Sequence, residues 1–218
     1  EFEPSERKRY DDAVMEYRLR LEGAEDIMMQ SFMEVMHTLR NMTGLEKVNA
    51  IVNTIGDTHD FHKGKYVIFC WYRDLAQRLH AALLDSVLIS GDLKPDERAR
   101  LAQLQKPIIT TISALSEGVD LSWARMVMYA EEHWPPGSQV QSLARVRRER
   151  IITHELDCNL DGWENEYLQK QASKELNEDP ILVYCVHVKD TIDETIHATT
   201  RRRSATAKEV LKEALGIY

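Results

Sequence analysis

The distribution of apolar and polar residues divides the chain near residue 65. The stretch Arg7–Leu39 contains no proline and a single glycine, and it is rich in Glu, Met, Leu and Arg, which are good helix formers. A further helix is predicted over Leu45–Ile55, where apolar residues recur at helical spacing, and Gly56 is expected to end it. The first third of the chain is therefore predicted to be helical.

Beyond residue 65, short apolar runs alternate with amphipathic segments such as Asp74–Leu84 and Pro95–Leu104. The runs are rich in β-branched and aromatic residues, which predicts strands buried on both faces. They are Tyr66–Cys70, Ser86–Ser90, Pro107–Thr111, Arg125–Tyr129 and Ile181–Val186. Strands that alternate with helices indicate a parallel sheet covered by helices on both faces. The predicted fold class is therefore α/β, with helical extensions at the N- and C-terminal ends.

Three later segments have a different texture. A helix is predicted over Val140–Arg150, and a terminal helical region over Thr191–Leu215. Between them, Ile151–Asp179 is polar and acidic, and it is predicted to be largely irregular. We therefore expect this stretch to interrupt the alternation of strands and helices before the last strand.

Composition excludes some classes of protein. Hydrophobic residues make up 43% and charged residues 29% of the 218 positions, which is ordinary for a globular chain and excludes wholesale disorder. No apolar run approaches the roughly 20 residues of a membrane helix, so no membrane partner is expected. The three cysteines stand far apart without metal-ligand spacing, which is typical of free thiols in a reducing compartment.

The charge balance gives two opposing indications. A net charge of -8 argues against a freestanding nucleic-acid binder, which normally has a basic excess. The arginines are nevertheless clustered, with four of them between positions 145 and 150 and three consecutive ones at 201–203. Because local clusters can bind phosphates on an acidic chain, the net charge does not decide the question.

The loops after the strands are where an α/β sheet binds its ligands. The most informative one leads from Trp134 into the predicted helix, on which Gln141, Arg145 and Arg148 fall at positions i, i+4 and i+7 of one face. Two guanidinium groups and an amide form a donor array that suits a polyphosphate. A solvated basic helix face is the alternative that spacing alone leaves open.

Two further loops carry weaker signals. The stretch Ser113–Leu121 is rich in hydroxyl groups and contains Gly118, so its backbone N–H groups could face a phosphate, although such turns often only cap helices. The turn at Ser90 and Gly91, with Arg98 downstream, is equally weak by itself.

The order and spacing of these segments are more specific than any one of them. Trp134-Pro135-Pro136 precedes Gln141, and arginines follow at 145 and 148. Upstream stand an apolar strand that ends in Phe69, a Gly91 with Arg98 after it, and Thr110-Thr111 followed by Gly118-Val119-Asp120-Leu121. A lysine, Lys47, precedes the first strand, and Asp190–Ile196 reads Asp-Thr-Ile-Asp-Glu-Thr-Ile.

This series resembles the second RecA-like lobe of superfamily-two helicases, and within them the Swi/Snf-type DNA translocases. The resemblance covers nearly the whole chain. It implies a RecA-like parallel sheet flanked by helices in three layers. Three positions depart from the usual pattern: Pro135 replaces Asn, Ser142 replaces Ala, and Arg147 replaces His.

The resemblance implies a set of site residues. In such enzymes ATP lies between two lobes, and the second lobe supplies arginine fingers. Arg148 is then expected to be the finger at the γ-phosphate, and Arg145 its partner. Gln141, Gly118 and Asp120 are expected at the nucleotide, with Asp120 binding the ribose hydroxyl or bracing Arg148. Contacts to the DNA backbone are expected from four further residues, Ser90, Gly91, Thr110 and Thr111.

Other parts of an ATPase are missing from the 218 residues. No G-x-x-x-x-G-K-[ST] motif occurs, and Asp193-Glu194 is better explained as a helix start than as a metal site. ATP and Mg²⁺ are therefore expected mainly on a first lobe, no metal site is expected here, and this chain alone is expected to hydrolyse no ATP. The expected partners are DNA, preferably tracked as a duplex, and the first lobe. We further expect a monomer inside the cell: in the cytoplasm or nucleoid, in a host cell if viral, or in the nucleus if eukaryotic.

The resemblance also divides the chain. Residues 1–64 form a helical lead-in, 65–150 the lobe with its motifs, 151–180 an insertion, and 181–218 the last strand and a helical brace. A non-catalytic, helicase-derived module that binds nucleic acid or protein is the alternative function. A small-molecule enzyme has little support, because the loops contain no evident nucleophile–base or carboxylate pair.

Overall fold

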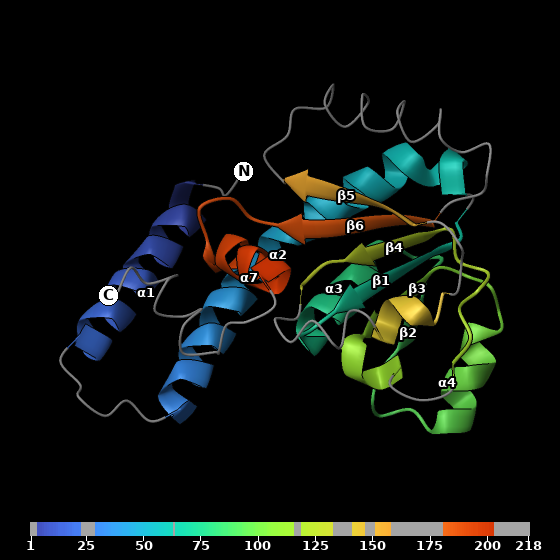
Figure 1. Cartoon of the computed structure of the whole chain (residues 1–218), viewed down its shortest axis with the longest axis horizontal. Helices are drawn as coiled ribbons and strands as arrows, with labels where there is room; N and C mark the ends of the chain where they lie inside the picture. The colour runs from blue at the N-terminus through green and yellow to red at the C-terminus, as the bar shows by residue number, and fades with distance from the viewer. Residues whose placement is uncertain are drawn as a thin grey trace.

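The computed structural model describes residues 4–22, 29–62, 64–115, 119–132, 141–146, 151–157 and 181–202. Two helices precede the sheet: α1 (Pro4–Glu22) and α2 (Met29–His62). Figure 1 shows α1 beside the first part of α2, both projecting beyond the sheet, while the rest of α2 passes behind the strands. They pack on each other and on the C-terminal helix α7 (Ile192–Arg202) through a small apolar cluster that includes Tyr10, Leu39 and Ile196. The helical lead-in and the C-terminal brace therefore form one unit.

The sheet has six strands in the order β2-β3-β1-β4-β6-β5, and every neighbouring pair is parallel. The strands are β1 (Tyr66–Cys70), β2 (Val87–Ile89), β3 (Ile108–Thr111), β4 (Met126–Tyr129), β5 (Ile151–Asp157) and β6 (Ile181–His187). Five of them are the strands predicted from the apolar runs. The predicted fold class, a RecA-like parallel sheet between helices, is confirmed.

The prediction was wrong at the start of the acidic segment. Ile151–Asp157 is not irregular, because it forms β5, which pairs with β6 along its whole length from Ile151↔Ile181 to Asp157↔His187. This strand lies at the edge of the sheet and contains Thr, His, Glu and Asp residues. Edge strands commonly carry such polar residues, so the apolar-run criterion does not detect them. The rest of this segment, residues 158–180, lies outside the described residues.

The prediction was also wrong about the helices before the sheet. Leu45–Ile55 is not a separate helix, since α2 runs without a break from Met29 to His62 and passes through both Gly44 and Gly56. Glycine lowers helix propensity by about 1 kcal/mol but does not by itself end a helix. Lys47, expected at a helix start, therefore lies inside α2.

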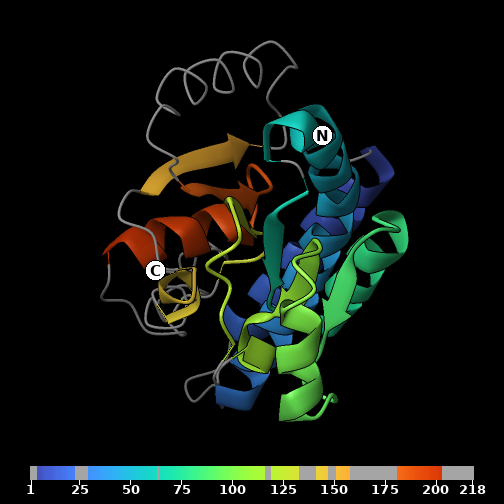
Figure 2. The same ribbon diagram turned by 90° about the vertical axis from the view of Figure 1, so that its right-hand side faces the viewer.

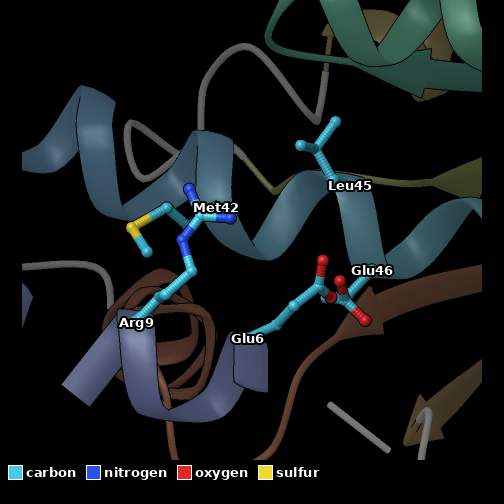
Figure 3. A pocket seen from close by; sticks show the side chains of 5 residues that line it. All are labelled: Glu6, Arg9, Met42, Leu45 and Glu46. Atoms are coloured by element: carbon cyan, nitrogen blue, oxygen red, sulfur yellow. The ribbon is translucent and has the colours of Figure 1, made fainter. Parts of the chain in front are cut away.

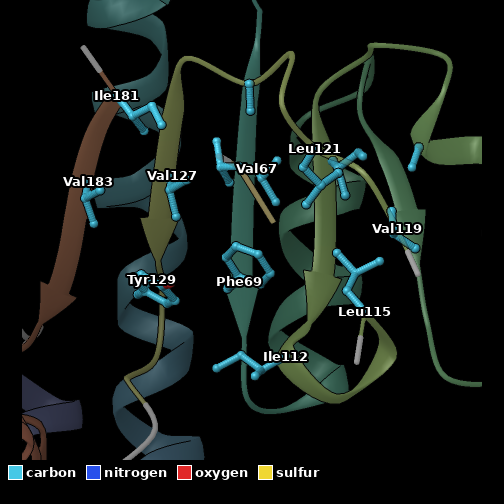
Figure 4. Close-up of a cluster of buried hydrophobic side chains, with 14 of the residues drawn as sticks. Val67, Phe69, Ile112, Leu115, Val119, Leu121, Val127, Tyr129, Ile181 and Val183 are labelled. Atoms are coloured by element: carbon cyan, nitrogen blue, oxygen red, sulfur yellow. The ribbon is translucent and has the colours of Figure 1, made fainter. Parts of the chain in front are cut away.

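Two apolar clusters cover the two faces of the sheet. On one face, α2 and α3 (Arg73–Ala82) lie side by side (Figure 2) and contribute residues such as Ile51, Ile55 and Leu79. On the other face, α4 (Pro95–Ala102), the 3₁₀ turn η1 (Ile112–Leu115) and residues 119–124 and 141–146 pack against β1 and β4. Figure 4 shows Phe69 and Tyr129 of this second cluster on neighbouring strands.

The parallel order places the carboxyl ends of all strands at one edge of the sheet. The residues that follow β1, β2, β3, β4 and β6 meet along this edge, which we call the rim. Every candidate loop of the sequence begins after one of these strands, and residues 119–124 and 141–146 then pack on one face of the sheet.

Candidate functional site

The described part of the arginine-bearing segment is a short helical turn at residues 141–146. Its inner side carries Ser142 and Val146, which are buried, while Gln141 is exposed and Arg145 is half-buried. Residues four apart share a helix face, so burial of 142 and 146 turns 141 and 145 together toward the outside. The sequence predicted this shared face for Gln141 and Arg145.

A backbone hydrogen bond joins this turn to the loop after β3. The N–H of Leu121 donates to the carbonyl oxygen of Arg145 over 3.1 Å. The preceding residue, Asp120, is exposed, and its Oδ1 accepts the N–H of Ser122 at 2.9 Å. Two segments that the sequence separates by more than twenty residues are therefore adjacent, and the structure brings Asp120, Gln141 and Arg145 into one region.

The two loops predicted to contact DNA are also adjacent. Ile89 pairs with Thr110, which places the turn at Ser90 and Gly91 beside the end of β3. Arg98 ties this turn to η1, because its Nε donates to Leu93 O at 2.9 Å and its Nη1 to Ala114 O at 2.6 Å. The downstream arginine of the motif therefore braces the two loops.

The four predicted DNA contacts differ in accessibility. Gly91 is exposed and Ser90 half-buried, whereas Thr110 and Thr111 are buried. The Thr110 hydroxyl donates to the Thr111 carbonyl at 3.1 Å, and the Thr111 hydroxyl lies 3.4 Å from that of Ser113. Ser90 and Gly91 are thus the better placed pair, and the contacts themselves stay predictions.

A buried carboxylate that the sequence did not indicate stands at the centre of the rim. Glu131 follows β4 and is 1% exposed. Its Oε2 accepts the N–H groups of Trp71 and Tyr72 at 2.9 and 2.8 Å, which fixes the loop after β1. Its other oxygen lies against Gly44 of α2, where an added Cβ would come within 3.4 Å. Burial raises the pKa of Glu131, and the charges of Arg40 and Lys47 oppose the rise.

The loop after β1 is therefore held from two sides. Tyr72 contacts α2, with the Arg40 guanidinium 5.5 Å from its ring centre and the His37 ring edge-on at 4.6 Å. Burial raises the pKa of the Tyr72 hydroxyl to about 12. Trp71 is half-buried and packs beside the second apolar cluster. These contacts fix the loop at the carboxyl end of β1.

A buried ion pair connects α2 with α7. Lys47 Nζ lies 2.7 Å from Asp193 Oδ2, and the two side chains are 1% and 6% exposed. Lys47 also donates to the carbonyl oxygen of Ala130 at 2.9 Å. Asp193 stands in the first turn of α7, where its Oδ2 also accepts the N–H of Val188 at 3.2 Å. The helix-start interpretation of Asp193 is confirmed.

A second contact to α7 begins at the next residue of the rim. His197 Nδ1 is 2.5 Å from Glu132 Oε2, and the carbonyl oxygen of Glu132 accepts a hydrogen bond from Arg40. The hydrogen bond that His197 donates to Glu132 raises the pKa of His197, and burial partly offsets this rise. Glu132, which leads toward Trp134, is therefore anchored to α2 through Arg40 and to α7 through His197.

Two predicted site residues, Arg148 and Gly118, lie outside the described residues, as does Trp134. In the part of the chain that the structure describes, no group of three or more His, Cys, Asp or Glu side chains could hold a metal ion. Nor does any helix there have the length and apolar character of a membrane span.

One pocket lies between α1 and α2. Figure 3 shows its lining, which consists of Glu6, Arg9, Met42, Leu45 and Glu46. None of these residues belongs to the predicted nucleotide or DNA site. The described residues of the candidate site therefore come from the loops after the strands and not from this pocket.

Comparison with known proteins agrees with this geometry. The model of the family described as the helicase conserved C-terminal domain matches residues 46–150. No curated protein matches the sequence. The solved C-terminal domain of a Sulfolobus solfataricus SWI2/SNF2 ATPase has a TM-score of 0.64 at 13% identity, covering 99% of this chain and 94% of that one.

Two larger structures share the fold. The Sulfolobus solfataricus SWI2/SNF2 ATPase core in complex with dsDNA has a TM-score of 0.62 at 14% identity, over 97% of this chain and 47% of that one. The C-terminal part of the Fun30 ATPase domain has a TM-score of 0.53 at 16% identity, over 79% and 52%. This chain thus spans about half the length of these two structures.

The fold is that of the C-terminal, second RecA-like lobe of Swi/Snf-type ATPases. Within it, residues 46–150 match the helicase conserved C-terminal domain.

Proposed function

We propose that this lobe completes the ATP site of a DNA translocase by supplying arginines to a nucleotide bound between it and a first lobe. The observation that carries the proposal is the bond between Leu121 N and Arg145 O. It holds the segment with Asp120 against the segment with Gln141 and Arg145 on one face of the sheet. An exposed amide and a half-exposed guanidinium fit the phosphates of ATP.

The roles follow from the charges involved. Arg148 stabilises the charge that develops on the γ-phosphate, and Arg145 assists it. Asp120 binds the ribose hydroxyl or braces Arg148, while Gly118 and Gln141 complete the nucleotide contacts. We assign Mg²⁺ and the phosphate loop to the first lobe. This chain by itself then hydrolyses no ATP.

DNA is the proposed substrate of the motor, tracked as a duplex. The resemblance of the fold to an ATPase core that was solved in complex with dsDNA supports this assignment. Ser90 and Gly91 form the accessible turn at the rim, and Arg98 braces it. Such contacts to the phosphate backbone hold DNA without reading its sequence.

The test uses a polypeptide that contains this lobe and a phosphate-loop lobe. Arg148→Ala is expected to reduce DNA-stimulated ATP hydrolysis by about 10³–10⁵-fold, the contribution of arginine fingers in nucleotide hydrolases. DNA binding should persist. Arg78→Ala is the matched control, because Arg78 is an exposed arginine of α3, which packs on the opposite face from residues 141–146.

Two results would refute the proposal. Unchanged turnover in Arg148→Ala would remove the finger assignment. ATP hydrolysis by the isolated chain, at a rate comparable with that of the two-lobe polypeptide, would refute the shared site.

A further inference from the structure

Two buried hydroxyl groups connect the arginine-bearing turn to the sheet. The Tyr129 hydroxyl, at the carboxyl end of β4, lies 2.7 Å from the Ser142 hydroxyl. Tyr129 is 2% exposed and Ser142 6% exposed, so water does not compete for either group. A hydrogen bond between neutral groups is most valuable in such surroundings, because losing one partner leaves the other buried and unsatisfied.

The tyrosine provides a fixed point. Its ring stacks on Phe69 of β1, with ring centres 5.4 Å apart and an interplanar angle of 20°. Both residues belong to the apolar cluster shown in Figure 4. Because burial raises the pKa of Tyr129, the group remains a neutral hydroxyl at physiological pH. The rigid sheet thus presents one hydroxyl at a defined position.

Ser142 lies between Gln141 and Arg145 in the turn. Arg145 N–H donates to the carbonyl oxygen of Ser142 at 3.3 Å, and Arg145 O accepts the bond from Leu121. Val146, which is 0% exposed, adds an apolar anchor. A turn held at Ser142, Arg145 and Val146 cannot rotate about its axis without breaking one of these contacts. Among these contacts, the hydrogen bond of Ser142 connects the turn directly to β4.

We propose that Tyr129 and Ser142 are positioning residues, whose mutual hydrogen bond sets the orientation of the turn that carries Gln141 and Arg145. The proposal rests on the function proposed above, since its consequence is the placement of arginines at ATP. Catalytic arginines act through geometry, and a displacement of about 1 Å can cost 10²-fold in rate. Because Leu121 and Val146 still hold the turn, the loss expected from breaking this bond alone is smaller, about tenfold.

The first measurement uses the chain itself. Tyr129→Phe and Ser142→Ala each remove one oxygen and keep the shape of the site. Exchange of the amide hydrogens of Leu121, Arg145 and Val146 with solvent is expected to accelerate about tenfold in each variant. The double variant should exchange no faster than either single one, because both substitutions break the same bond.

The control variant is Ile55→Val, which trims the apolar cluster on the opposite face of the sheet. It lowers global stability and should leave the relative exchange rates of these three amides unchanged. If Tyr129→Phe behaves like Ile55→Val, or if the two hydroxyl deletions act additively, the bond does not orient the turn and the proposal is overturned.

The second measurement uses the two-lobe polypeptide. In Ser142→Ala, kcat for ATP should fall about tenfold while KM for ATP and the affinity for DNA change by less than twofold. A purely structural role would lower the amount of active protein in proportion to stability, as Ile55→Val does. If the wild-type polypeptide is active and kcat is unchanged in both Tyr129→Phe and Ser142→Ala, the positioning role is overturned. An inactive wild type overturns the proposed function, and the exchange experiment still decides whether the bond orients the turn.

Discussion

The buried pair of Lys47 and Asp193 permits the sharpest test of what holds the lobe together. Lys47→Met preserves most of the side-chain length and removes the charge. It leaves Asp193, which is 6% exposed, without the partner at 2.7 Å, and it leaves the Ala130 carbonyl without its donor at 2.9 Å. Removing one partner of a buried ion pair costs about 3–5 kcal/mol.

The same chain contains an exposed pair that serves as the control. Arg73 and Asp92 form an ion pair whose side chains are 57% and 59% exposed. Solvent screens such pairs, so Arg73→Met is expected to change the free energy of unfolding by less than about 1 kcal/mol. The two substitutions remove the same kind of charge, and burial is the main difference between the two pairs.

A double variant separates the ion pair from other effects of the substitution. Asp193→Asn keeps an oxygen that can accept the Val188 N–H and removes the stranded charge. Lys47→Met with Asp193→Asn should therefore be more stable than Lys47→Met alone, by about 1–3 kcal/mol.

Urea unfolding followed by circular dichroism gives the free energies, and the melting temperature of Lys47→Met should fall by about 6–20 °C. A loss in Lys47→Met as small as that in Arg73→Met would refute the reasoning. So would a double variant no more stable than Lys47→Met.

Two further predictions concern α2 and α7. Gly56→Ala should raise the free energy of unfolding by about 0.5–1 kcal/mol, because a Cβ there meets nothing within 4 Å, while Gly44→Ala should gain less because its Cβ would lie 3.4 Å from Glu131. Equal gains in urea unfolding would contradict this. The raised pKa of His197 stabilises the fold fully below the ordinary value of about 6.5 and progressively less as pH rises through the raised value. The stability lost in His197→Gln should therefore shrink between pH 6 and pH 8, and a constant or growing loss would contradict the assignment.

The strands were predictable wherever burial on both faces imposes a continuous apolar run. β1, β3 and β4 are buried at every position, and their sequences contain almost no charged residue. β5 escaped prediction because an edge strand pairs on one side only and tolerates polar residues on its faces. The local sequence of β5 carries little information about its partner β6, because their pairing is a tertiary contact.

The length of α2 has a similar explanation. Glycine is common at helix ends, yet α2 continues through both Gly44 and Gly56. At Gly44 the reason is visible, since the glycine allows α2 to approach the buried Glu131 carboxylate. Packing across the sheet edge therefore overrides the local propensity, and a criterion based on neighbours in sequence cannot include a residue 87 positions away.

The candidate site was likewise predictable only in part. The shared face of Gln141 and Arg145 follows from helical periodicity, which the sequence contains. The burial of the charged groups beneath the rim does not follow from the sequence. Lys47, Glu131 and Asp193 come from three distant segments, and each is polar enough to suggest a surface position. Burying them is costly unless each is paired. Lys47 connects α2 to α7 and to the end of β4, and Glu131 connects the ends of β4 and β1. The rim is consequently stiff where α2 and α7 hold it. A substitution such as Lys47→Met should therefore loosen the docking of α7 before it disturbs the strands.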